Sequence, residues 1–465
     1  MGCAVLDVGK THAKLSLVRP DGTVVVRRRV ANTVRDAAPY PHADVERLFE
    51  WLCDALRETC ATQPVDRMIC TTHGATAALL SRDRLALPVM DYEWPGFPGV
   101  EAEYERLRDS FEATLSPSLP VGLNLARQIH WQSQRWPDLY AQVDRVLLYP
   151  QYWAWRLCGE SAAEVSSLGS HTDLWRPLAG EPSALAVHLG VDRRLPPLRA
   201  ASAVLGEIDR RRLGLGEGAP IPVHCGVHDS SAAYVAQFPD PAGSGTVVST
   251  GTWIVCMSPL ADAVRLDPLR DTSGTVSVFG VPLGCSRFMG GREFAAIAGE
   301  QGVAVTANEA DLAAVMAAGL FALPAFAASG PFQQGSGRGR FHGPAPESAG
   351  ERAALAALYC ALVTDVCLGL IGAQGEIVFD GPFAANPLFL GVLAALRPGD
   401  RVFASDCADG PTLGAAALAY GVAWRGAARP LQASMLQSDA VRAYRELWHE
   451  LVQNRLRSCK INQSG

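Results

Sequence analysis

The stretch AVLDVGKTHAKLSLVRPDGTVVVRRRV, residues 4–30, decides the fold of the first part of this chain. It contains the string GKT at residues 9–11, which is how a Walker-type phosphate loop ends. That motif needs a glycine five residues earlier, where Ala4 stands, and a helix directly afterwards. Instead, an apolar run is followed by an Asp-Gly turn at 21–22 and a second β-rich run, which predicts a β-hairpin. The Walker interpretation is therefore rejected.

Composition indicates an ordinary globular protein with a large core. The chain has 465 residues, enough for two large domains or about three of ordinary size, with 48% hydrophobic and 19% charged residues. A net charge of −6 argues against a nucleic-acid or anionic-membrane partner. The basic run at residues 27–29 is expected to be a solvated strand edge.

Cysteine usage and the apolar segments bear on the compartment. The 12 cysteines include no C-x-x-C pair, which favours reduced thiols over a zinc site or a disulfide framework. The N-terminus lacks a basic region followed by an apolar run, so no signal peptide is expected. The most apolar stretch, LAAVMAAGLFALPAFAAS from Leu312, contains Pro324 and is expected to be a helix followed by a buried strand. These features predict a cytoplasmic location.

Periodicity predicts two α/β halves. The segment DVERLFEWLCDALRETC, residues 44–60, is expected to be an amphipathic helix, and VDRMICTTHG, residues 65–74, a buried strand ending in a turn. The expected domains are 1–238 and 243–430, followed by a helix and tail at 431–465, with the Pro- and Gly-rich joint at 238–246. Each domain opens with a glycine-cornered hairpin, which suggests a duplicated α/β domain.

The last expected helix has a marked apolar face. It lies in DAVRAYRELWHELVQNRL and places Val441, Tyr444, Leu447, Trp448 and Leu451 on one side.

Phosphoryl transfer requires phosphate-binding groups, a carboxylate for Mg²⁺ and a base for the hydroxyl proton. Asp7 ends the first strand beside Gly9, and Lys10, Thr11 and Lys14 offer charge and a hydroxyl nearby. An aspartate before a glycine is also common in plain turns.

Two further segments carry the same ambiguity. Asp229, with His228 before it, stands between a strand and a helix, where it is either a helix N-cap or a general base. The turn Ser249, Thr250, Gly251 and Thr252 offers hydroxyls and amides, although β-turn chemistry alone would also explain it.

Taken together and in order, several stretches resemble the FGGY family of carbohydrate kinases, within the sugar kinase, heat-shock and actin superfamily. The carrying segments are AVLDVGKTHAKLSLV, CTTHGATAALL, LPVMDYEWPG, LLYPQYWAWRLCGE, GVHDSSAAY, VVSTGTWIV and FDGPFAANPLFLGVLAAL. The motifs STGTW and HDSSAA are most similar to the branch that phosphorylates L-rhamnulose and L-fuculose. The resemblance implies an α/β fold of two ribonuclease H-like, actin-type domains with a cleft between them.

The resemblance also implies roles for particular residues. Asp229 matches the catalytic base and Asp7 the aspartate near Mg²⁺. The implied ATP-binding residues are Gly9, Lys10, Thr11, Lys14, Ser249, Thr250, Gly251, Thr252, Gly381, Asn386 and Gly414. The implied sugar contacts are His73, Tyr92, Glu93, Gln151, Tyr152, His228 and Asp229. A His such as His73 at a strand end is otherwise often purely structural.

The chain departs from the family pattern at several of these positions. Lys10 replaces the usual Thr of the first loop, and Asp380 stands where the nucleotide-binding turn normally begins with Gly. Tyr92 and Glu93 replace a Trp-Asn pair, and Gln151 replaces a sugar-binding Asp. These changes leave Asp7 and Asp229 in place and alter positions where members of the family contact the sugar.

The sequence therefore predicts an ATP- and Mg²⁺-dependent kinase for a terminal hydroxyl of a small ketose or polyol, compatible with a homodimer. Two alternatives are a non-catalytic sugar sensor and a sugar-independent ATPase on the same fold.

Overall fold

The computed structural model describes residues 1–240, 245–261, 264–333, 339–407, 409–421, 429–430 and 438–461. The chain divides into two compact units. Unit 1 comprises residues 1–243, 274–282 and 409–425, and unit 2 comprises residues 244–273, 283–408 and 426–465. Residues 274–282 and 409–425, which the sequence analysis assigned to the second domain, are thus grouped with unit 1.

Unit 1 contains one large sheet together with smaller sheets of two or three strands. Its strands are β1 (Gly2–Val8), β2 (His12–Val18), β3 (Val24–Ala31), β4 (Val34–Arg35), β5 (His42–Ala43), β6 (Val65–Thr72), β7 (Ala77–Ser81), β8 (Arg84–Leu85), β9 (Arg145–Leu148), β10 (Trp175–Arg176), β11 (Glu181–Pro182), β12 (Val204–Glu207), β13 (Pro222–His224) and β14 (Val227–His228). Its helices are α1 (Val45–Thr62), α2 (Glu101–Leu107), α3 (Phe111–Thr114), α4 (Leu125–Arg135), α5 (Pro137–Ala141), α6 (Tyr149–Cys158), α7 (Val165–Leu168), α8 (Ala184–His188), α9 (Asp229–Gln237) and α14 (Gly410–Tyr420).

The large sheet has the strand order β12-β13-β6-β1-β2-β3, and β14 also pairs with β6. The predicted hairpin is confirmed, because β2 pairs antiparallel with both β1 and β3. Strand β6 then runs parallel to β1, and β13 and β14 run parallel to β6. Three antiparallel strands followed by parallel ones therefore place several strand ends at one edge.

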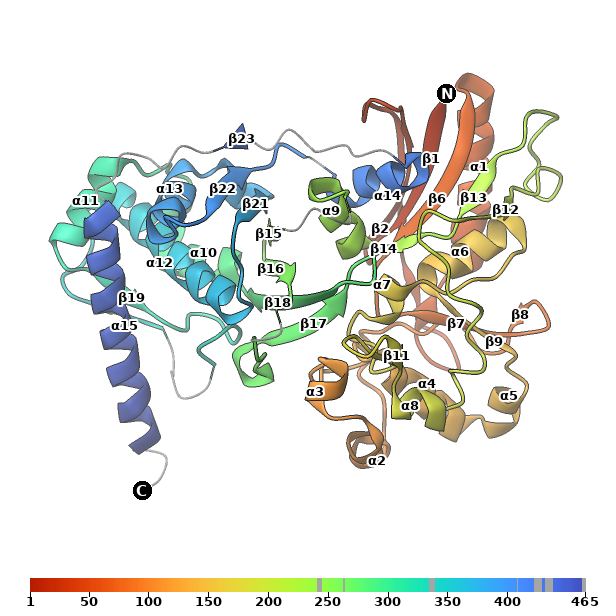
Figure 1. The fold of residues 1–465 in the computed structure, drawn as a ribbon, viewed down its shortest axis with the longest axis horizontal. Helices are drawn as coiled ribbons and strands as arrows, with labels where there is room; N and C mark the ends of the chain where they lie inside the picture. Colours follow the sequence, from red (N-terminus) through yellow and green to blue (C-terminus); the bar gives the residue numbers. More distant parts are fainter. Residues whose placement is uncertain are drawn as a thin grey trace. The chain divides into compact units, whose positions relative to one another are not determined.

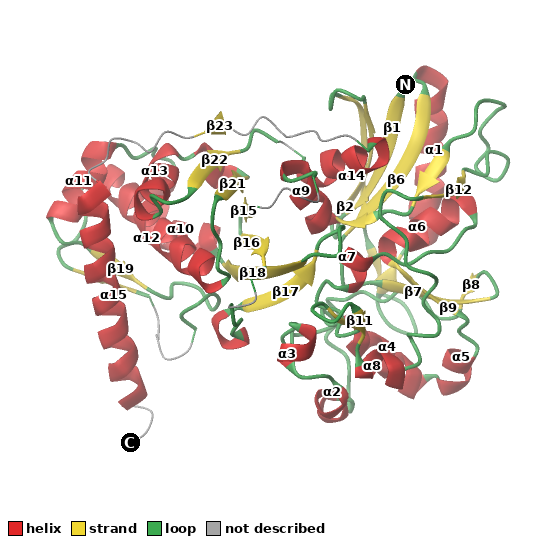
Figure 2. Ribbon diagram, in the orientation of Figure 1, coloured by secondary structure: helices red, strands yellow, loops and turns green. Residues whose placement is uncertain are grey.

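Both faces of this sheet are buried, as alternate residues of β1 show. Ala4, Leu6 and Val8 join the cluster that includes residues of α1 and α6, whereas Cys3 and Val5 join the cluster that includes residues of α9 and α14. Figure 1 and Figure 2 show these two pairs of helices on opposite faces of the sheet. The predicted amphipathic helix is confirmed as α1.

Unit 2 repeats the strand pattern of unit 1. Its elements are β15 (Thr246–Thr250), β16 (Ile254–Pro259), a 3₁₀ turn at Pro268–Arg270, β17 (Thr272–Val276), β18 (Pro282–Phe288), α10 (Gly290–Val303), α11 (Glu309–Ala317), β19 (Phe321–Leu323), β20 (Arg340–His342), α12 (Ala349–Leu370), β21 (Glu376–Asp380), a 3₁₀ turn at Pro382–Ala385, α13 (Pro387–Leu396), β22 (Arg401–Ala404), β23 (Arg429–Pro430) and α15 (Ser438–Ile461). In the order β18-β16-β15-β21-β22, the first three strands are antiparallel neighbours and the last three are parallel ones. The duplication expected from the two hairpins is thus present in the strand order.

The core helix α12 was not identified from the sequence. It packs against α10, α11 and α13, and it is apolar all round, so no amphipathic stripe marks it. Among the described residues it is the one helix long and apolar enough to span a membrane by length and composition, but 78% of its most apolar window is buried inside the protein. The stretch from Leu312 forms α11 and the buried strand β19, as predicted.

The C-terminal helix α15 follows the predicted apolar face with one exception. Val441, Tyr444 and Trp448 are buried, but Leu447 is 53% exposed. Val452 is buried instead, at 3% exposure. The prediction was wrong at Leu447 because residues one position apart on a helix point about 100° apart, so Leu447 and Trp448 cannot both face the core fully.

Candidate active site

In unit 1, three parallel strands bring their carboxyl ends to one edge of the large sheet. In the β1–β6 register Asp7 lies opposite Thr71, and in the β14–β6 register His228 lies opposite Thr72. The chain continues from β6 into His73, whose amide donates to the carbonyl of Val8 at 3.0 Å. Topology therefore gathers Asp7, His73 and Asp229, which are distant in sequence, at the edge where ligands of α/β sheets bind.

The first loop, between β1 and β2, is a tight turn braced by β3. The Gly9 amide donates to the His12 carbonyl at 2.9 Å, and the Asn32 side chain donates to the Gly9 carbonyl at 2.8 Å. Thr11 lies exposed in this loop. A short, fixed turn of this kind leaves backbone and hydroxyl groups near its tip available to a phosphate.

Asp7 belongs to a chain of alternating charges. The Lys14 ammonium lies 2.7 Å from the Asp7 carboxylate and 3.4 Å from that of Asp409, which Arg27 approaches at 3.0 Å. Burial raises the pKa of Asp7, and the Lys14 charge opposes that rise. Although burial disfavours the charged ammonium, Asp7 and Asp409 together hold the pKa of Lys14 above its ordinary value. A carboxylate oxygen is the ligand type that Mg²⁺ prefers, so Asp7 fits the role that the resemblance implies.

Asp229 is the first residue of α9 rather than its cap. The N-cap position is taken by His228, and one Asp229 carboxylate oxygen accepts the Ser230 amide at 2.6 Å. The alternative interpretation of Asp229 as the N-cap is therefore wrong. Its side chain is 29% exposed. Burial raises the pKa of this carboxyl, while the hydrogen bonds from Ser230 oppose that rise, so the group combines partial access with increased basicity.

Two neutral histidines flank Asp229. The Nε2 atom of His228 lies 3.3 Å from the Asp229 carboxylate, and burial lowers the pKa of His228 to about 4. Burial also lowers the pKa of His73. The Nδ1 atom of His73 lies 2.9 Å from the Gly74 carbonyl, which assigns the proton to Nδ1 and leaves Nε2 as an acceptor.

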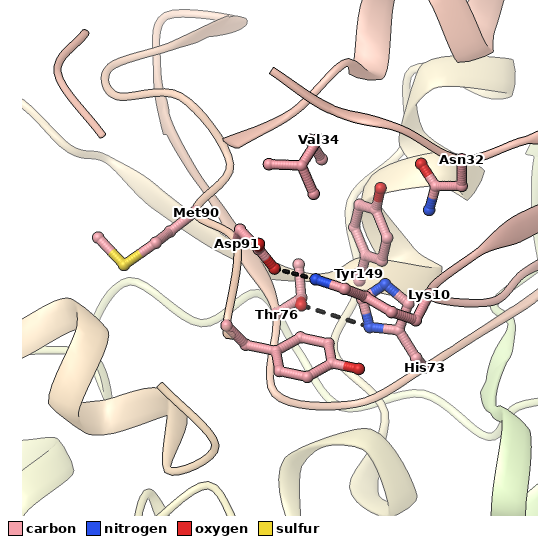
Figure 3. A pocket seen from close by; sticks show the side chains of 10 residues that line it. Lys10, Asn32, Val34, His73, Thr76, Met90, Asp91 and Tyr149 are labelled. Atoms are coloured by element: carbon pink, nitrogen blue, oxygen red, sulfur yellow. Dashed lines mark hydrogen bonds and ion pairs between the residues drawn. The ribbon is translucent and has the colours of Figure 1, made fainter. Parts of the chain in front are cut away.

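A narrow pocket, with about 20 Å³ of enclosed space, opens beside His73. The His73 ring lies between the rings of Tyr92 and Tyr149, at centroid distances of 5.2 Å and 5.1 Å. Figure 3 shows Lys10 pointing across the pocket toward Asp91, with Asn32 and Val34 above this pair in the view. Aromatic walls with a few polar groups suit a small hydroxylated ligand.

The structure brings some of the predicted sugar contacts to this pocket but not others. Tyr92 and His73 line it, and a carboxylate oxygen of Glu93 lies 3.3 Å from the ammonium of Lys10, which also lines it. Gln151 is fully buried and donates to the carbonyls of Cys225 and Gly226 at 3.2 and 3.1 Å, so it holds the chain just before Asp229.

Several residues at the site were missed by the sequence reasoning. Tyr152 is a core residue whose hydroxyl accepts from Arg156 at 2.9 Å, whereas the unselected Tyr149, at the start of the same helix, lines the pocket. Asp91 was not selected, although it directly precedes the predicted sugar contacts Tyr92 and Glu93 in sequence and lines the pocket with Tyr92. Asp409 carried no such signal, because it is 395 residues from Lys14 in sequence.

In unit 2, the second hairpin is joined to the glycine turn after β21. The Thr250 hydroxyl donates to the Asp380 carbonyl at 2.6 Å and accepts the Phe383 amide at 3.0 Å, so it is used internally. Ser249 and Thr252 are exposed beside it, with Gly251 between Thr250 and Thr252 at the turn.

Gly381 is required where it stands. Its φ is +87°, and a Cβ would lie 2.0 Å from the Thr250 carbonyl oxygen. Asp380 accepts the Gly381 amide at 2.7 Å, so this unusual carboxylate stabilises the turn.

A second pocket, of about 310 Å³, lies entirely within unit 2. Phe294, Val303 and Phe383 give it apolar walls, and Asn386 lies on its lining. The Asn386 side chain caps α13 by accepting the amides of Leu388 and Phe389, each at 3.1 Å. A pocket of mixed aromatic and amide character beside a glycine turn is suited to a planar base.

Gly414 is a packing residue of unit 1 in this structure. It is buried within α14, and a Cβ there would lie 1.7 Å from the carbonyl oxygen of Ala232 on α9. The sequence analysis listed it among nucleotide-binding residues, but its own surroundings are the backbone of the helix that carries Asp229. Its immediate effect is to let α14 and α9 cross closely.

Comparisons with known proteins agree with this architecture. The family model described as "Carbohydrate kinase FGGY, C-terminal domain" matches residues 242–429. The crystal structure of a carbohydrate kinase from Novosphingobium aromaticivorans is 35% identical, with a TM-score of 0.87 over 97% of this chain and 100% of that chain.

Two further relatives are more distant. The L-xylulose/3-keto-L-gulonate kinase of Escherichia coli (strain K12) is 30% identical over 185 residues, which is 38% of this chain and only 34% of that protein. A gluconate kinase from Lactobacillus acidophilus shares the fold, with a TM-score of 0.76 at 14% identity over 98% of this chain and 99% of that chain.

The predicted fold is confirmed by these neighbours, which are sugar kinases of the actin-like ATPase fold. With its full-length match to a carbohydrate kinase and its matched C-terminal family domain, the chain belongs to the FGGY family of carbohydrate kinases.

Proposed function

We propose that this protein transfers the γ-phosphoryl group of ATP to a terminal hydroxyl of a small ketose or polyol, with Asp229 as general base. The observation that carries this proposal is the gathering of Asp7, His73 and Asp229 at one sheet edge, next to an aromatic-walled pocket. A partly exposed carboxylate with a raised pKa suits a group that must accept a proton during the reaction.

In the proposed reaction the sugar hydroxyl gives its proton to the Asp229 carboxylate. Its oxygen forms a bond to the γ-phosphorus while the bond between that phosphorus and the bridging oxygen of ADP breaks. The neutral His73 offers Nε2 to a substrate hydroxyl, because its Nδ1 is committed to the Gly74 carbonyl. His228 lies beside Asp229 but is neutral, so it does not compensate the negative charge of the base.

The family resemblance implies nucleotide-binding residues in each unit, and the geometry within each unit supports that role. In unit 1, Thr11 and Lys14 offer a hydroxyl and a charge to phosphates, and Gly9 keeps the turn between them and Asp7 tight. In unit 2, the exposed Ser249 and Thr252 offer hydroxyls to phosphates. The pocket beside Asn386 would take the adenine base. Mg²⁺ held with ATP would neutralise phosphate charge, with Asp7 as its protein carboxylate.

The sugar remains the finer part of the proposal. The motifs favour a deoxyketohexose such as L-rhamnulose or L-fuculose. The names of the relatives add one further neutral sugar, xylulose, and two sugar acids, 3-keto-gulonate and gluconate. Both neutral sugars and sugar acids are therefore candidate substrates.

The test is a coupled ADP-release assay over ketoses, polyols and sugar acids. Sugar-dependent ADP formation is expected with at least one of them, and Asp229→Asn should lower its turnover at least about a hundredfold. The exposed Asp138 on α5 supplies the control, since Asp138→Asn should leave turnover unchanged. Near-normal turnover in the Asp229→Asn variant would contradict the assignment.

The same assay separates the alternatives. A sugar sensor would bind the sugar without releasing ADP, and a sugar-independent ATPase would release ADP at the same rate with no sugar present. Either result would overturn the proposed kinase activity.

A further inference from the structure

The lysine that replaces the usual threonine of the first loop is held by groups from another part of the chain. The Lys10 ammonium forms an ion pair with Asp91, drawn in Figure 3, and lies 3.3 Å from a carboxylate oxygen of Glu93. It also lies 4.7 Å from the centre of the Tyr92 ring. An ammonium has three N–H donors, and two carboxylates and an aromatic face occupy the directions around it.

The charges at this place do not balance. Lys10 contributes one positive charge, and Asp91 and Glu93 contribute two negative ones. Among the described residues that line the pocket, Lys10 is the only cation, because burial lowers the pKa of His73 and keeps it neutral near pH 7. The negative charge of Asp229 also reaches this pocket: it opposes the lowering of the His73 pKa and adds to the raised pKa of Tyr92.

We infer that Lys10, Asp91 and Glu93 form a clasp that makes the pocket select neutral ketoses and polyols and reject sugar acids. The carboxylate of a sugar acid would have to displace Asp91 from Lys10, or lie beside two carboxylates without a free cation. Hydroxyl groups, in contrast, accept from the ammonium and donate to the carboxylates without adding charge. The inference rests on the proposed function, since it assigns the substrate class of the same pocket.

The exposure of the three side chains supports a selective rather than purely structural role. Lys10 and Asp91 are largely covered, at 23% and 13% exposure, so solvent screens their pairing only in part. Glu93 is 60% exposed and completes the clasp from the solvent side. Unit charges about 4 Å apart in such surroundings change a binding constant by roughly tenfold or more.

The test uses neutral and acidic compounds of matched carbon skeleton, such as D-glucitol with D-gluconate and xylitol with D-xylonate. Binding is measured by calorimetry at low and high salt, and turnover by ADP release. The wild-type protein should favour the neutral member of a pair at least about tenfold, and less so at high salt. Asp91→Asn should reduce that preference about tenfold or more, because it frees the ammonium for a carboxylate.

A second variant moves the preference the other way. Lys10→Met leaves two carboxylates without their cation, so it should increase the discrimination against acids. The matched control is Asp83→Asn, which removes a carboxylate paired with Arg145 on the surface, and it should leave the preference unchanged.

The possible outcomes separate the clasp from the proposed reaction. Binding of the neutral compound without its phosphorylation would support the clasp and overturn the kinase proposal. Preference for the acid in the wild-type protein, or an unchanged preference in Asp91→Asn, would overturn the clasp whatever the turnover.

Discussion

Replacing Gly414 by alanine tests whether this glycine acts through packing or through the nucleotide. The new Cβ would lie 1.7 Å from the Ala232 carbonyl oxygen and 2.6 Å from its carbon, both backbone atoms that cannot rotate away. Restoring an ordinary carbon–oxygen contact of about 3.3 Å requires α14 and α9 to separate by roughly 1.6 Å.

The expected cost follows from two opposing effects. Overpacking of this kind costs about 1–3 kcal/mol or more, whereas replacing a helical glycine by alanine gains at most about 1 kcal/mol. The net loss of about 1–2 kcal/mol should lower the melting temperature of unit 1 by roughly 2–8 °C. Because α9 begins at Asp229, turnover should fall together with stability.

Thermal unfolding followed by circular dichroism, with and without ATP, measures both effects. The control is Gly369→Ala on α12, where no heavy atom lies within 4 Å of the added Cβ, so no loss of stability is expected. A Gly414→Ala variant with unchanged melting temperature but weakened ATP affinity would refute the packing argument. It would instead support the nucleotide contact that the family resemblance implies.

Two further predictions concern unit 2. Burial raises the pKa of Glu293 from 4.5 to about 7, although the Tyr359 hydroxyl donates to it. The folded chain therefore holds a proton that the unfolded chain loses, and stability should fall as the pH rises from about 4.5 to about 7. Glu293→Gln should flatten this part of the pH profile of thermal unfolding, and an unchanged slope would contradict the assignment. On α15, Trp448→Ala should cost about 3–5 kcal/mol in chemical denaturation and Leu447→Ala less than about 1 kcal/mol, because Trp448 is 0% and Leu447 53% exposed; similar costs would mean that Leu447 packs against the core.

The sequence determined the local parts of this protein. The Asp-Gly turn at 21–22 and the two β-rich runs beside it fold as the β2–β3 hairpin, because a turn and its flanking pattern act within a few residues. The spacing that predicted α1 held for the same reason, since Val45, Leu48, Phe49, Leu52 and Leu56 are all buried. The order of motifs was also enough to indicate the family.

The composition of the site was decided by tertiary structure. Lys10 meets Asp91, 81 residues away, and Lys14 meets Asp409, 395 residues away, and neither pairing has a local sequence signal. On α6, the helix rotation rather than the motif decides that Tyr149 lines the pocket and Gln151 lies in the core. Spacing fixes which residues share a face, but only the packing of strands and helices decides what that face meets.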